Sequence, residues 1–437
     1  MKDAFTKLTM LLLCVIMVVS VANAAEKGTL RAKIVDMEQG NVLPGVPITI
    51  TSPVMMGSKT SISNVDGEVL FINLTPGLYS VKAELEGFKT IVLTKIRVSL
   101  GLEAVVHLKM ETAQIQETVT VTADVPEVNT TKATIAEHVS SDTVESLPVA
   151  RDFVGYLQLA AGVNVIPNSQ GRDTPEDPAG KGGMNYSDRG TQGTRGSGKR
   201  GSRDNLYLLD GLNVTGLASQ TALLSFNNEV IQEQELMTSG VPAEYGGGKG
   251  VVGNIVTKSG GNKLSGSLNV YFQPKGFFLP YGGSEYNNAK DDPTMDETML
   301  EGYKDNKYDT AFTLGGPIMK DKVWFFISGQ YRNDKNSFNL SRSASPTEEE
   351  VDYLNKRIGL FGKITFKLSA SYTFNFMYFV DDQESEGERD KNIIKTQQRV
   401  QSWNTGVISG YYQKVLSDSL LVDFRFGHYW WEWTRNS

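Results

Sequence analysis

Apolar and polar residues alternate along much of this chain, which is the pattern of β-strands with one buried and one exposed face. In residues 28–111 the alternation is broken at regular intervals by turn signals such as Pro44-Gly45, Asp66-Gly67 and Pro76-Gly77. Strands and turns at this spacing predict a small β-sandwich of about seven strands.

A second alternating region begins after residue 260. Its first strand has an apolar face of Leu264, Leu268, Val270 and Phe272 and a polar face of Ser265, Ser267, Asn269 and Tyr271. The pattern recurs at 308–315, 323–332, 358–366, 368–379, 399–413 and 420–429. Strands of about ten residues with one apolar face suit tilted strands that cross a lipid bilayer.

The connections in this region alternate in length. Those at 316–322, near Lys367 and at 414–419 are short, whereas those at 274–307, 333–357 and 380–398 are long and polar. Outer-membrane β-barrels alternate short periplasmic turns with longer outer loops. All five tryptophans also lie here, where we expect them to form aromatic girdles. We therefore predict part of a transmembrane antiparallel β-barrel over residues 261–437.

The number of these strands has a consequence for the length of the protein. About seven strands are present, whereas plugged transporters have roughly 22. We therefore expect the sequence to be the N-terminal part of a longer protein, with a truncated gene as the alternative.

Glycines crowd the stretch from Glu244 to Gly266, which raises the possibility of a phosphate-binding loop. Such a loop needs Gly-Lys followed by Ser or Thr and then a helix. Here Lys249 is followed by Gly250 and by the β-branched run VVGNIVT. A phosphate loop is therefore excluded, and the glycines are interpreted as turn and strand positions where backbones approach closely.

Residues 125–260 mix helix and strand signals. Ser141 is expected to cap a short helix over 142–147, and 151–162 has the apolar spacing of a second helix that ends at Gly162. Residues 167–203 contain few apolar residues and several arginines and lysines. We interpret them as a solvated loop, with attraction of an anionic ligand as the alternative.

The first residues have the three parts of a secretory signal. Lys2 and Lys7 precede an apolar core over about 8–21, and small residues place the cleavage between Ala24 and Ala25. The apolar core is shorter than the about 20 residues that a membrane helix needs. Cys14 lies within this signal and is the only cysteine, so disulfides and cysteine-rich metal sites are excluded in the mature chain.

Composition and residue spacing point away from several functions. The net charge of −7 provides no basic field for nucleic acid. The three histidines fit no metal or triad spacing, and the acidic run at 291–297 lacks the ligand spacing and glycine of a calcium loop. We therefore predict no catalytic residues, no cofactor, no metal site and no enzyme activity.

Two segments of the first part of the chain resemble known modules. The pattern LPGVPITI…NVDGEVLFINLTPGLYSVKAELEGF resembles the carboxypeptidase-regulatory-like module, which implies an immunoglobulin- or prealbumin-like sandwich over 25–112. The run QETVTVTAD in the linker at 113–124 could be a last sandwich strand, an extended linker, or a strand left unpaired for another chain. It resembles the TonB box of outer-membrane receptors, formed here by Glu117, Thr118, Val119, Thr120, Val121, Thr122 and Ala123.

Three motifs in residues 125–260 together resemble the α+β plug domain of TonB-dependent outer-membrane receptors. They are RGSRDNLYLLDGLNV, IQEQELMTSGVPAEYG and GGKGVVGNIVTKSGGN. The family motif corresponds here to Arg200, Gly201, Asp210, Gly211, Glu244, Tyr245, Gly246, Gly253 and Asn254.

The resemblance implies a mainly β receptor in the cell outer membrane, with its N-terminal domains in the periplasm or inside the barrel. It implies uptake of a siderophore, glycan or peptide, energised by a periplasmic TonB-type partner. A carbohydrate-binding or adhesive surface protein without transport is the alternative.

Overall fold

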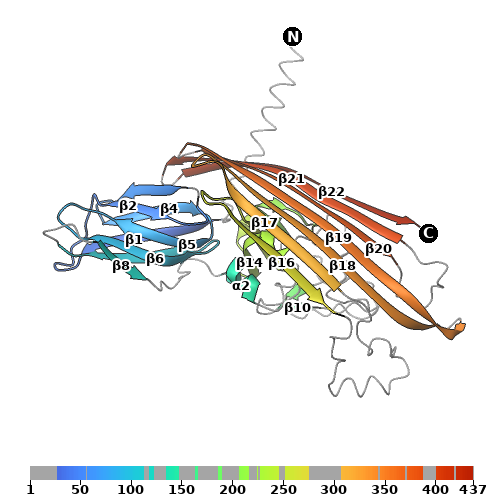
Figure 1. Cartoon of the computed structure of the whole chain (residues 1–437). Coiled ribbons are helices and arrows are strands. Elements are labelled where there is room, and N and C mark those ends of the chain that lie inside the picture. Colours follow the sequence, from blue (N-terminus) through green and yellow to red (C-terminus); the bar gives the residue numbers. More distant parts are fainter. Residues whose placement is uncertain are drawn as a thin grey trace, which may run out of the picture.

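The chain folds into three β-rich parts in the computed structural model (Figure 1). The structure describes residues 27–55, 57–112, 118–122, 134–146, 163–165, 186–188, 206–215, 224, 227–245, 251–274, 307–342, 345–369, 372–386, 400–417 and 420–436. The predicted signal, with Ala24 and Ala25, and the helix predicted over 151–162 lie outside these residues. The prediction of a mainly β chain with an N-terminal sandwich is confirmed.

The first part is a sandwich of two sheets. Its smaller sheet has the order β4-β1-β7, and its larger sheet has the order β3-β2-β5-β6-β8. The strands are β1 (Gly28–Asp36), β2 (Pro47–Thr51), β3 (Ser58–Ile62), β4 (Glu68–Leu74), β5 (Gly77–Ala83), β6 (Thr90–Val98), β7 (Glu103–Met110) and β8 (Thr118–Thr122).

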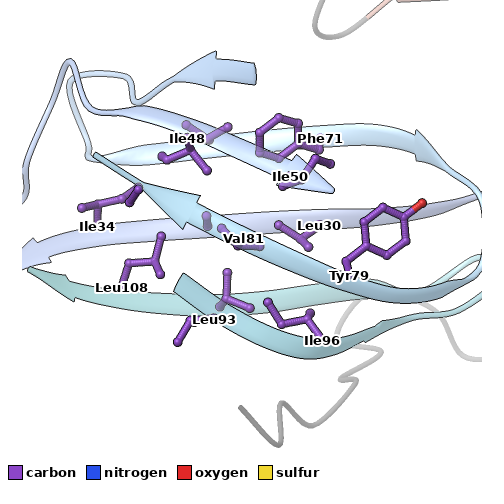
Figure 2. Packing of buried hydrophobic residues seen from close by; sticks show 14 of the residues in the cluster. Leu30, Ile34, Ile48, Ile50, Phe71, Tyr79, Val81, Leu93, Ile96 and Leu108 are labelled. Carbon is purple, nitrogen blue, oxygen red and sulfur yellow. The ribbon is translucent and has the colours of Figure 1, made fainter. Parts of the chain in front are cut away.

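Strict alternation explains the sandwich core. In β1 every second residue is buried, and Leu30 and Ile34 meet Ile48 and Val81 of the facing sheet (Figure 2). Every buried member of this core comes from residues 30–110. The predicted turn at Gly67 has φ of 68°, and an added Cβ would lie 2.7 Å from a backbone oxygen, so this position requires glycine.

The second part, named here the central sheet, has the order β13-β12-β15-β14-β9. Ser140 caps its helix because its Oγ accepts from the backbone N–H of Thr143, so the prediction that Ser141 is the cap is wrong by one residue. The elements are β9 (Ile135–Ser140), α2 (Ser141–Ser146), β12 (Leu206–Leu209), β13 (Leu212–Asn213), η2 (Asn228–Val230), β14 (Ile231–Ser239), η3 (Ala243–Tyr245) and β15 (Val252–Thr257). A separate hairpin pairs β10 (Val163–Val165) with β11 (Tyr186–Asp188).

The third part, named here the long sheet, pairs seven antiparallel strands in chain order. They are β16 (Ser265–Gln273), β17 (Lys307–Met319), β18 (Val323–Arg342), β19 (Ser345–Ser369), β20 (Tyr372–Glu386), β21 (Val400–Ser417) and β22 (Leu420–Asn436). Its two faces differ as the alternation predicts. Leu268, Val270 and Phe272 of β16 are exposed on the outer face. On the opposite face Asn269 donates to Glu229, although Tyr271 on that face is also exposed.

The long sheet also corrects three details of the prediction. The loop predicted over 333–357 is wrong, because β18 and β19 stay paired until Arg342 and Ser345. Backbone pairing in water needs no apolar face, so the loss of alternation did not end these strands. β19 runs past Lys367 to Ser369 and β20 runs to Glu386, so strand replaces the turn predicted near Lys367 and the first part of the loop predicted over 380–398.

The predicted aromatic girdle is wrong for two of the tryptophans. Trp324 and Trp403 are buried, and Nε1 of Trp324 donates to Oδ1 of Asn262 at 2.8 Å. Trp431, by contrast, is exposed. Position in the alternation decides these cases, because neighbours along a strand face opposite sides.

Candidate functional site

Five residues of the predicted TonB box form β8, while Glu117 and Ala123 lie outside the described residues. β8 runs parallel to β6, with Thr90 opposite Thr118 and Thr94 opposite Thr122. Among the strands that the structure describes, only β6 borders β8, so β8 is an edge strand. Of the three alternatives for this segment, the structure therefore has the last strand of the sandwich.

The turn between β12 and β13 carries the predicted plug residues Asp210 and Gly211. Their φ angles are 45° and 78°, as a two-residue Asp-Gly hairpin turn requires. The carboxylate of Asp210 accepts from the backbone N–H of Thr257 at 2.9 Å and from its hydroxyl at 2.6 Å. It also accepts from Nζ of Lys363, on β19, at 2.8 Å. Asp210 thus joins the central sheet to the long sheet.

The charge of Asp210 follows from these partners. Burial alone would raise the pKa of its carboxyl group. The ammonium of Lys363 and the hydrogen bonds from Lys363 and Thr257 outweigh burial and hold the pKa below its ordinary value. The Lys363 ammonium also donates to the Thr257 hydroxyl at 2.8 Å. These three residues are named here the Asp210 cluster.

The other predicted plug residues do not form one site with Asp210. Gly253 and Asn254 lie in β15, where every residue is buried, and Nδ2 of Asn254 is 3.5 Å from Oε2 of Glu235. Tyr245 ends η3 and is buried in a small apolar cluster. The side chain of Glu244 and all of Arg200, Gly201 and Gly246 lie outside what the structure describes.

The sandwich contacts the central sheet through the segment that follows β6. The backbone N–H of Leu100 donates to Oε1 of Glu233, on β14, at 2.6 Å, and both residues are buried. Nδ1 of His138, on the neighbouring β9, lies 3.5 Å from the same carboxylate oxygen. Arg97 and Asp142 form a further ion pair at 3.6 Å.

An apolar core joins the central sheet to the inner face of the long sheet. From the central sheet and its loops it includes Tyr207, Leu209, Ile231 and Ile255, all buried, and from the long sheet it includes Phe326, Phe361, Met377, Phe379 and Val407. Figure 1 shows the central sheet against one face of the long strands. The long sheet therefore buries its inner face on the central sheet.

Sequence reasoning missed Lys363 and Glu233, which make the contacts between parts. A signal existed for Lys363, because it falls between Phe361 and Thr365 at the inward positions of an alternating strand. A charged residue at such a position needs a buried partner. Glu233 gave no comparable signal, since the run IQEQEL has four consecutive polar residues and therefore no alternation that marks a buried face.

The chemistry of these residues suits docking. Within the described ranges no three His, Cys, Asp or Glu side chains are placed to hold a metal ion. No helix in those ranges is both long and apolar enough to cross a bilayer. Hydrogen-bonded groups around Asp210 and Glu233 join the parts, and an apolar core joins the central sheet to the long sheet.

Comparison with known proteins agrees with this architecture. Residues 29–111 match the carboxypeptidase regulatory-like domain. The chain is 23% identical over 388 residues to the TonB-dependent transporter Oar of Myxococcus xanthus, a match that covers 80% of this chain and 33% of that protein. The chain thus spans about a third of the length of this curated relative.

The chain is also partly similar to two solved structures. The transporter YddB of Escherichia coli is 14% identical with a TM-score of 0.48, over 67% of this chain and 38% of that one. The ferric enterobactin receptor of Pseudomonas aeruginosa is 16% identical with a TM-score of 0.40, over 65% of this chain and 41% of that one.

Proposed function

We propose that this chain, a homologue of a TonB-dependent transporter, takes part in energised uptake across the outer membrane of a substrate of the siderophore, glycan or peptide class. In this proposal the central sheet is the plug, the long sheet is barrel wall and the sandwich is periplasmic. The observation that carries it is the difference between the two faces of the long sheet. The outer face exposes apolar side chains, and the inner face is buried on the central sheet.

The outer face of the long sheet supports membrane insertion. Exposed apolar side chains alternate with inward residues, as at Ile327, which lies between the buried Phe326 and Ser328. Such a face is costly in water and favourable in lipid. Hydrogen bonds between neighbouring strands satisfy backbone groups that lipid cannot hydrate.

The edge strand β8 supports a coupling role for Glu117–Ala123. An edge strand presents unpaired backbone donors and acceptors, to which a strand of another chain can add. In the proposed mechanism the TonB-type partner pairs along the open edge of β8. The sandwich then presents an already extended segment, so less conformational entropy is lost on binding than with a free linker.

The path of the chain connects this segment to the proposed plug. After β8 the next strand of the central sheet is β9, which pairs with β14 at the sheet edge. A pull on β8 therefore reaches the plug at β9. The Asp210 cluster lies at the β12–β13 turn, on the other side of the sheet, and stays bound to the long sheet.

Proline substitution tests the coupling role. Val119→Pro and Val121→Pro should each abolish uptake that depends on the proton-motive force, because proline removes a backbone donor and disfavours pairing. Substrate binding to whole cells should remain. Val119→Thr is the matched control, because threonine keeps the β-branched shape and the donor. Normal energised uptake in both proline variants would show that the segment has no coupling role.

Cell fractionation tests the location. We expect the protein in the outer-membrane fraction of a sucrose gradient, with a mature N-terminus at Ala25. Recovery of the protein from an intact gene in the soluble periplasmic fraction would contradict the membrane role of the long sheet.

A further inference from the structure

A cavity of about 120 Å³ lies where the sandwich, the β12–β13 turn and the long sheet meet. Its walls come from all three parts: Thr75 belongs to the sandwich, Leu212 to the central sheet, and Tyr411 to the long sheet. The charged side chains that line it are Lys27, Lys59, Lys363, Lys367, Arg425 and Asp210.

Positive charge dominates this lining. The lining contains one carboxylate, that of Asp210, and it is already bonded to Lys363 and Thr257 at 2.6–2.9 Å. Nζ of Lys59 donates to the backbone oxygen of Ile72, a neutral acceptor, at 3.2 Å. Arg425 pairs with Asp423 at 3.2 Å beside the cavity.

Three of the lysines act on one another. Lys59 comes from β3 and Lys367 from β19. A Cβ added to Gly57 would lie 3.8 Å from Nζ of Lys367 and 3.4 Å from Oδ1 of Asp321, so one carboxylate also lies on this side of the cavity. Burial, and then the charges of Lys27 and Lys367, lower the pKa of Lys59 to about 8. Like charges that are brought together and partly dehydrated disfavour docking unless an anion offsets them.

We propose that this cavity binds a phosphate group, either free phosphate or the headgroup of an anionic phospholipid. Lysine ammonium groups bind phosphate as point charges, and their convergence from separate parts of the chain suits an anion with more than one charge. A bound phosphate would neutralise the lysines across the junction and hold the sandwich on the long sheet. This inference does not depend on transport, because it requires only the docked arrangement.

Calorimetry on the purified protein in detergent micelles tests the site with inorganic phosphate. We expect saturable binding that weakens about tenfold in Lys59→Gln and in Lys367→Gln, since each removes one charge from the anion. Lys109→Gln is the matched control, because Lys109 is exposed on β7, away from the cavity. Lys59→Arg keeps the charge and should restore binding, which separates loss of the site from misfolding.

A second arm identifies the source of the phosphate group. The protein is reconstituted into nanodiscs of phosphatidylcholine with or without phosphatidylglycerol. Phosphate binding that disappears when phosphatidylglycerol is present indicates a lipid headgroup, and binding that persists indicates the free anion. Absence of phosphate binding in micelles together with no effect of Lys59→Gln on phosphatidylglycerol binding would overturn the proposal. Equal weakening by Lys109→Gln would overturn it as well.

Discussion

The carboxylate of Asp210 links two sheets that are far apart in sequence. It lies in a hairpin turn of the central sheet and bonds to Lys363 in the long sheet. The Lys363 side chain is 7% exposed, so loss of its partner leaves a poorly hydrated ammonium group. The strength of the link therefore resides in a pair of charges as well as in apolar packing.

We expect Asp210→Asn to lower the stability of the docked protein by about 3 kcal/mol, because the variant keeps the turn but leaves Lys363 without its carboxylate. A lower melting temperature and faster proteolysis of the central sheet in micelles would report the loss. Asp66→Asn, in an exposed Asp-Gly turn of the sandwich, is the control and should change neither. Identical behaviour of the two variants would show that the Asp210 cluster contributes nothing to docking.

Lys59 gives the cavity a dependence on pH. Its pKa is lowered to about 8 from an ordinary value of 10.5, so folding releases a proton between these values and the contribution to stability rises with pH across that window. The affinity for an anion changes in the opposite direction: it falls as pH rises, because the charged ammonium of Lys59 is lost above about pH 8. The other charged groups that face the cavity are Lys27, Lys363, Lys367, Arg425 and Asp210.

We expect sulfate, whose charge is constant over this range, to bind more weakly at pH 9 than at pH 7. Calorimetry at the two pH values measures the difference. Lys59→Gln should abolish most of it, and Lys109→Gln should not. If the difference in sulfate affinity between pH 7 and pH 9 is as large in Lys59→Gln as in the unchanged protein, another group is responsible for the titration.

At the scale of residues, the sequence predicts the local conformation of a residue better than it predicts which distant residue that residue contacts. Asp210-Gly211 is a recognisable turn from sequence, because these two residues accept left-handed backbones. Its partner Lys363 lies 153 residues further along the chain, and no local pattern joins the two. The placement of Lys363 depends on the register of the long sheet, which is a property of the folded chain.

At the scale of elements, glycine and aromatic residues lie opposite each other in the long sheet. Gly329 faces Phe312, Gly406 faces Trp430 and Gly410 faces Phe426, and in each pair a Cβ on the glycine would collide with the ring. The ring of Trp430 is also held by a hydrogen bond from Nε1 to Oδ1 of Asn404 at 2.9 Å. Each glycine therefore provides the space for its aromatic partner.

We expect Gly406→Val to destabilise the pairing of β21 and β22 by about 2 kcal/mol, because the Trp430 ring has to leave its place. Gly362→Val is the matched control, since a Cβ at Gly362 has nothing within 4 Å. Heat-dependent gel migration and Trp fluorescence would report the change. Equal effects of the two substitutions would argue against a specific role for the ring.

The alternating pattern predicted which segments form strands but not where strands end. Residues 333–357 lose the apolar face and were expected to form a loop, yet β18 and β19 pair through most of this range. A strand continues for as long as its backbone pairs with the neighbouring strand, and this pairing depends little on side chains. For the same reason the sequence left three alternatives for β8, whose place is set by its pairing with β6.

At the scale of the whole molecule, the sandwich has a core of its own. Among the side chains that the structure describes, the buried apolar residues of this core lie between Leu30 and Met110, and none of them comes from the other two parts. Its contacts with the central sheet include the hydrogen bond from Leu100 to Glu233 and the ion pair between Arg97 and Asp142. The sandwich therefore satisfies the physical requirement for a separate folding unit.

We expect residues 27–124, expressed alone, to be soluble and to unfold in urea in one cooperative transition. Leu30→Ala should cost about 3 kcal/mol, because it leaves a cavity in the core. Met37→Ala, at a side chain that is 62% exposed, should cost little. Circular dichroism against urea measures both variants, and a gradual, non-cooperative loss of signal would mean that the sandwich needs the rest of the chain.

In the proposed mechanism a pull on β8 acts first on its parallel pairing with β6 at the edge of the sandwich. Five residue pairs hold β8 to β6. In the proposed mechanism, detachment of β8 would lengthen the segment between the sandwich and β9 and would uncover the edge of β6. The next strand under load, β9, is held by six residue pairs to β14. Under the pull proposed for the TonB-type partner, we therefore expect the parallel β6–β8 pairing to separate before the antiparallel β9–β14 pairing.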